Sequence, residues 1–118
     1  MEIDVARDTC LGFRGVTEGF PFGPGVLVFK VAGKMFALLS LDNLPPTMNL
    51  KCDPERALEL RAAFEGVVPG YHRNKRLWNT VTLEGDVPDA LIEELIADSY
   101  ALVFAKLPKK TQRALEAS

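Results

Sequence analysis

The sequence has few of the residues on which most catalytic and metal sites depend. Its 118 residues include one histidine, one tryptophan and two cysteines. The cysteines are not spaced as C-x-x-C, so neither a structural zinc site nor a disulfide framework is expected. Cys10 and Cys52 each have apolar neighbours in the sequence, which predicts buried thiols in the reduced state.

Long apolar runs are also absent. No segment reaches the roughly 18 to 20 residues that cross a bilayer. The N-terminus, Met1-Glu2-Ile3-Asp4, lacks the positive flank and apolar core of a signal peptide. A hydrophobic content of 47% and a charged content of 25% match soluble globular proteins. We therefore expect one cytoplasmic domain over residues 1–118 that does not associate with membranes.

Motifs for common enzymes are missing as well. The sequence has no G-x-S-x-G, P-loop or dinucleotide fingerprint. A Cys/His dyad would need a buried cysteine beside His72, which lies in a basic and exposed segment. Glu93 and Glu94 are adjacent, so they diverge by about 100° on a helix instead of converging on a cation. The sequence predicts a protein that is not an enzyme and uses no metal or cofactor.

The spacing of apolar residues predicts an α+β fold. Helices are expected over residues 2–12, from the N-cap Asp53 to Gly66, from residues 86–89 to Pro108, and over residues 109–117. Strands are expected over residues 26–31, 34–41, 47–52 and 80–83, the first two joined by a hairpin at Ala32-Gly33. This order implies an antiparallel sheet with helices packed on one face.

The opposite face of that sheet is expected to be polar. Residues 47–52 alternate between polar and apolar side chains, and residues 80–83 do the same. This period of two is typical of strands with one buried and one solvated face. The side chains predicted on the solvated face are Asn49, Lys51, Thr80 and Thr82.

Positive charge is concentrated in one segment, although the net charge is −2. Residues 66–79 carry three cations and no acid, whereas residues 84–98 carry six acids and no base. The basic segment also contains the only histidine and the only tryptophan. Basic donors beside aromatic side chains are typical of phosphate-binding surfaces. A dipolar protein can bind phosphates at its basic face while its acidic side keeps it soluble.

These residues predict a DNA-binding surface. Cations would neutralise phosphates, Asn74 would donate to sugar or phosphate, and His72 or Trp78 would stack on a base. Lysines flanking the first hairpin, together with the polar sheet face, would extend the surface. The candidate residues are Lys30, Lys34, Asn49, Lys51, His72, Arg73, Asn74, Lys75, Arg76 and Trp78.

Each part of this surface has another interpretation. A single tryptophan before a strand is often a core anchor, and lysines at strand edges prevent sheets from aggregating. An adaptor that binds a protein partner, or a module that binds a small anion, could use the same polar face. The sequence predicts neither the oligomeric state nor a DNA sequence preference.

Several segments resemble the MmcQ/YjbR family, in the right order between about residues 15 and 110. The resemblance implies a frataxin-like (CyaY-like) fold, often described as a double-wing DNA-binding fold. It also implies that the matched lysines, His72, Asn74 and Trp78 line one surface. The segments are Phe29-Lys30-Val31-Ala32-Gly33-Lys34-Met35-Phe36-Ala37, Asn49-Leu50-Lys51-Cys52-Asp53-Pro54-Glu55, Pro69-Gly70-Tyr71-His72, Asn74-Lys75, Trp78-Asn79-Thr80-Val81 and Ser99-Tyr100.

Overall fold

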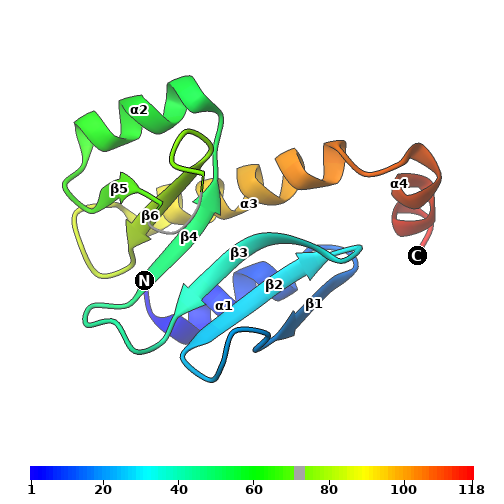
Figure 1. Ribbon diagram of the computed structural model, residues 1–118, viewed down its shortest axis with the longest axis horizontal. Coiled ribbons are helices and arrows are strands. Elements are labelled where there is room, and N and C mark those ends of the chain that lie inside the picture. The colour runs from blue at the N-terminus through cyan, green and yellow to red at the C-terminus, as the bar shows by residue number, and fades with distance from the viewer. Residues whose placement is uncertain (71–73) are drawn as a thin grey trace.

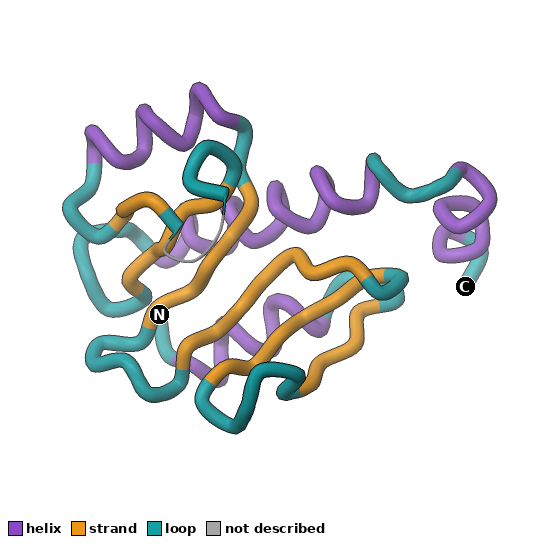
Figure 2. Tube along the Cα trace, viewed as in Figure 1, coloured by secondary structure: helices purple, strands orange, loops and turns teal. Residues whose placement is uncertain are grey.

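The computed structural model describes residues 1–70 and 74–118, which form an antiparallel sheet and helices α1 to α4 (Figure 1; Figure 2). The sheet has six strands in the order β1-β2-β3-β4-β6-β5. The α+β prediction is confirmed. The elements are α1 (Ile3–Leu11), β1 (Val16–Gly19), β2 (Val26–Val31), β3 (Lys34–Ser40), β4 (Thr47–Lys51), α2 (Pro54–Ala63), β5 (Val67–Pro69), β6 (Trp78–Thr82), α3 (Asp89–Ala105) and α4 (Lys109–Glu116).

The turn between β2 and β3 forms as the sequence predicted. Ala32 has a φ of 49° and Gly33 a φ of 78°. A two-residue hairpin turn of this kind needs positive φ at both positions, because its twist then matches that of the strands. Glycine adopts this conformation without the steric cost that other residues have.

Two short edge strands, β1 and β5, were not predicted. The strand β1 pairs with β2, and β5 pairs with β6. In β5, only Val67 and Val68 suggest a strand, and Pro69 argues against one. Proline is tolerated here because β5 is an edge strand, where a missing N–H leaves no ladder bond unmade.

Helix α2 begins as predicted but ends earlier. The Asp53 side chain accepts hydrogen bonds from the backbone N–H groups of Glu55 and Arg56, and Pro54 occupies the first helical position. The helix ends at Ala63, and not at Gly66, because Phe64 is already extended. The Asp86 carboxylate accepts hydrogen bonds from the next two N–H groups, those of Glu65 and Gly66, each at 2.8 Å, and the chain then turns into β5.

The core lies between one face of the sheet and three helices, as predicted. Ala6 of α1, Ala57 of α2 and Ile92 of α3 belong to the same buried cluster as the sheet residues Phe29 and Leu50. In Figure 1, α1 and α3 lie behind the strands.

Two positions correct the predicted helix faces. Val5 was expected against the core but is 46% exposed. Ala63 of α2 is also exposed. Both lie at the margin of a helical stripe, where spacing alone does not decide which side chain the sheet covers.

The open face of the sheet carries the predicted polar residues. Thr47 pairs with Thr82, Asn49 with Thr80, and Lys51 with Trp78 across β4 and β6. The alternating residues of both strands are buried, so these side chains lie on the side away from the main core. The predicted alternation of polar and apolar faces is confirmed.

The sheet splits between β3 and β4 at one end. The paired register stops at Ala37 and Leu50, although β4 continues to Lys51. There the hydroxyl of Ser99, from α3, accepts a hydrogen bond from Lys51 N at 2.8 Å and donates one to Phe36 O at 2.5 Å. The two strands diverge toward this end in Figure 1, with α3 visible between them. A buried side chain of α3 thus replaces strand-to-strand hydrogen bonding.

Candidate anion-binding surface

The antiparallel topology gathers five cations from four segments at one end of the sheet. At this end β2 and β4 finish while β3 and β6 begin, and we call it the basic end. None of the five takes part in an ion pair within residues 1–70 and 74–118. They are Lys30 of β2, Lys34 at the start of β3, Lys51 at the end of β4, and Lys75 and Arg76 before β6.

Acidic residues concentrate at the opposite end of the sheet. Asp42 lies between β3 and β4, Glu65 precedes β5, and Glu84 and Asp86 follow β6. Asp53 and Asp98 do lie near the end of β4, but the first carboxylate caps α2 and the second forms an ion pair with Arg56. The charge separation seen along the sequence therefore becomes a separation between the two ends of the sheet.

The turn that carries Lys75 and Arg76 is fixed by hydrogen bonds. Asn74 accepts through its side-chain Oδ1 from Arg76 N at 3.0 Å, and its backbone oxygen accepts from Leu77 N and Trp78 N. Arg61 of α2 donates to the backbone oxygen of Lys75. Both cationic side chains are exposed. The side-chain oxygen of Asn74 holds this turn, and the donation by Asn74 to sugar or phosphate stays a prediction.

Two further candidates have partners of their own. Asn49 Oδ1 accepts a hydrogen bond from Thr80 Oγ1 at 2.6 Å, as a cross-strand pair on the open face. Trp78 is half-buried and lies opposite Lys51. A Cβ added at Gly70 would lie 2.8 Å from the Cβ of Trp78, so the backbones of Gly70 and Trp78 approach closely there. His72 and Arg73 lie outside the described residues.

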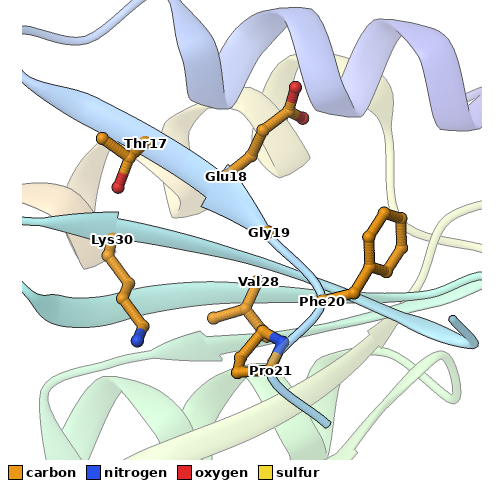
Figure 3. A pocket seen from close by; sticks show the side chains of 7 residues that line it. All are labelled: Thr17, Glu18, Gly19, Phe20, Pro21, Val28 and Lys30. Atoms are coloured by element: carbon orange, nitrogen blue, oxygen red, sulfur yellow. The ribbon is translucent and has the colours of Figure 1, made fainter. Parts of the chain in front are cut away.

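Lys30 lines a shallow pocket at the edge of the open face. Figure 3 shows its side chain on the same side of the strands as Thr17, Val28 and Pro21. Glu18 points away toward α1, where its carboxylate binds the Arg7 guanidinium at 2.5 Å. The acid nearest to Lys30 in this pocket is therefore already neutralised by another cation.

Lys34 and Lys51 line a second cavity, of about 390 Å³, together with Lys106 at the end of α3. Burial lowers the pKa of the Lys51 ammonium, and the nearby positive charge of Lys106 lowers it further. Lys106 was not among the predicted site residues. Only the packing of α3 across the split sheet brings it beside β3 and β4, so no local sequence signal could have identified it.

Arg61 and Asn79 also escaped the sequence prediction. Asn79 is 2% exposed, accepts from Arg61 Nε at 2.6 Å and donates to the backbone oxygen of Ala57. The detectable signal was a polar residue at an inward position of an alternating strand. This pair of a half-buried arginine and a buried asparagine joins α2 to β6, and Arg61 also holds the turn that carries Lys75.

The two thiols are buried beneath the surface of the protein. Cys10 and Cys52 are buried and free, as predicted. Burial raises the pKa of the Cys10 thiol to about 12, and it also raises the pKa of Cys52.

Among the described residues, no group of three or more His, Cys, Asp or Glu side chains has the geometry to hold a metal ion. In that same part of the chain, no helix has both the length and the hydrophobicity of a membrane-spanning segment.

The fold and the surface together define a small α+β protein with helices on one face of its sheet and cations gathered at one end. Residues 11–102 match the YjbR family, and the chain belongs to that family. The predicted resemblance is confirmed.

Relatives of known sequence and structure agree with this assignment. The Escherichia coli protein YbdF is 40% identical over 110 residues, covering 93% of this chain and 90% of that protein. The Escherichia coli protein YjbR is 36% identical over 115 residues, or 98% of each. A crystal structure of a Deinococcus radiodurans protein with a DUF419 domain superposes with a TM-score of 0.91 at 42% identity, covering 97% of this chain and 87% of that one.

Proposed function

We propose that this protein binds DNA through the basic end of its sheet and is not an enzyme. The observation that supports this proposal most strongly is the convergence of five cations without carboxylate partners, brought together from four segments by the strand order. Cations that converge from separate segments at one end are arranged to neutralise several phosphates at once. The proposal includes a cytoplasmic location.

The frataxin-like, double-wing interpretation of the fold belongs to the same proposal. The wings would be the β2–β3 turn, which carries Lys34, and the β5–β6 connection, which carries Lys75 and Arg76. Both lie at the basic end, and Lys51 lies between them on β4. Two basic segments with a lysine between them fit a duplex better than a single basic loop would.

This arrangement predicts a steep dependence of affinity on salt. Each phosphate contact on duplex DNA lowers log K by about 0.9 per tenfold rise in salt. Five contacts would give a slope of about −4.5, so affinity should fall by roughly 500-fold between 50 and 200 mM salt. The test is fluorescence anisotropy with a labelled duplex over this range.

A double variant tests whether the basic end carries this binding. Lys75→Ala with Arg76→Ala should flatten the slope by about 1.8. A matched control, Lys110→Ala with Arg113→Ala, removes the same charge from exposed positions on α4 and should leave the slope unchanged. The proposal fails if the wild type does not bind duplex at 50 mM salt, or if the two double variants behave alike.

A module that binds a small anion is the second candidate, and the cavity beside Lys51 favours it. An adaptor that binds a protein partner would use the polar open face of the sheet. Binding of duplex with the predicted slope would favour DNA over both.

A further inference from the structure

The cavity at the split in the sheet is lined by positive charge above an apolar floor. It has a volume of about 390 Å³, within the usual range for small-molecule sites. No carboxylate is among the side chains that line it. The residues that matter here are the cations Lys34, Lys51 and Lys106 and the apolar Met35, Val103 and Leu107.

The cavity exists because β3 and β4 separate there. The Ser99 hydroxyl satisfies both Lys51 N and Phe36 O, so the strands need not close on each other. Val103 in the last turn of α3 and Leu107 just after that helix then supply the floor, and they are 6% and 7% exposed. The hydrogen bonds of Ser99 and the packing of α3 both fix this opening, so it is a built feature of the fold.

The positive charges of Lys51 and Lys106 repel one another at this cavity, and no ion pair among the described residues offsets this repulsion. The lowered pKa of Lys51 reflects its burial and its proximity to Lys106. A bound anion would offset both the burial of the Lys51 charge and its repulsion by Lys106, because the anion supplies charge-assisted hydrogen-bond acceptors at the rim. The apolar floor would be covered by the uncharged part of the same molecule.

We propose that this cavity binds a small organic phosphate monoester, with its dianionic head among the three lysines and its apolar body on Met35, Val103 and Leu107. A dianion matches three cations better than a monocarboxylate does. The site shares Lys34 and Lys51 with the proposed DNA surface, whereas Lys106 belongs to the cavity alone.

Isothermal titration calorimetry with phenyl phosphate tests the proposal. Phenyl phosphate should bind more tightly than inorganic phosphate, which lacks the apolar body, and more tightly than phenol, which lacks the charge. Lys106→Met keeps the apolar stem of an exposed side chain and removes the charge. It should weaken phenyl phosphate binding about tenfold or more, because a hydrogen bond to a charged group is lost. Lys51→Met should do the same, whereas the control Lys110→Met should have no effect.

The DNA-binding variants separate the two proposals. Lys75→Ala with Arg76→Ala should bind phenyl phosphate as the wild type does, while its DNA salt slope falls. The small-anion proposal is overturned if phenyl phosphate does not bind at millimolar concentration. It is equally overturned if phenol or inorganic phosphate binds as tightly, or if neither Lys106→Met nor Lys51→Met weakens binding. Each of these results leaves the DNA measurement intact.

Discussion

Replacing Ser99 by alanine should destabilise the protein severely for a change of one atom. Ser99 is fully buried, and its hydroxyl both accepts from Lys51 N and donates to Phe36 O. Ser99→Ala leaves two backbone groups without these partners at the split in the sheet. An unsatisfied buried polar group costs roughly 1 to 3 kcal/mol. We expect the free energy of unfolding to fall by about 2 to 4 kcal/mol in total.

The expected change in melting temperature follows from the size of the chain. Unfolding entropy is about 2.1 cal/mol/K per residue, or roughly 0.25 kcal/mol/K for a chain of this length. A loss of about 2 to 4 kcal/mol therefore lowers Tm by about 8 to 16 °C. Circular dichroism melts and urea titrations measure the two quantities independently.

A matched serine on β3 supplies the control. The hydroxyl of Ser40 makes no hydrogen bond within the described part of the chain, and the residue is only half-buried. Ser40→Ala should change the free energy of unfolding by no more than about 0.5 kcal/mol. If Ser99→Ala cost no more than Ser40→Ala, the hydroxyl would not be holding β3 and β4 apart. The account of how the cavity forms would then be wrong.

Two further predictions concern the close backbone contact and the thiols. Gly70→Ala should lower the free energy of unfolding by about 1 to 3 kcal/mol in urea, because the new Cβ would lie 2.8 Å from Trp78 Cβ and 2.9 Å from Trp78 O. Gly19→Ala, where nothing lies within 4 Å, is the control, and equal losses would contradict the argument. Cys10 should not react with Ellman's reagent at pH 8 until the protein unfolds, and rapid labelling of the native state would refute its burial. Because its folded pKa is raised from 9.0 to about 12, the unfolded chain ionises first. Stability should therefore fall between pH 9 and about 12, and less steeply in Cys10→Ala.

Local chemistry was sufficient to predict most of the elements. Asp53 followed by Pro54 marks a helix start because the carboxylate satisfies free N–H groups and proline loses nothing at the first helical position. Ala32-Gly33 marks a hairpin because the turn needs positive φ. Strands β1 and β5 escaped prediction because edge pairing, and not their composition, makes them strands.

The sequence also identified most of the cations but not that Lys34 and Lys51 line a cavity with Lys106. By itself it determined the α+β class, the polar face of the sheet and the concentration of charge, since these depend on spacing along the chain. Only the tertiary structure decided that Lys51 faces Lys106 across a cavity, because residues 55 positions apart meet through the packing of α3 against the split sheet. The spacing of residues along the chain shows the periodicity within one helix or strand. Contacts between elements depend instead on which strand-to-strand hydrogen bonds remain unmade in the folded chain, as between the ends of β3 and β4.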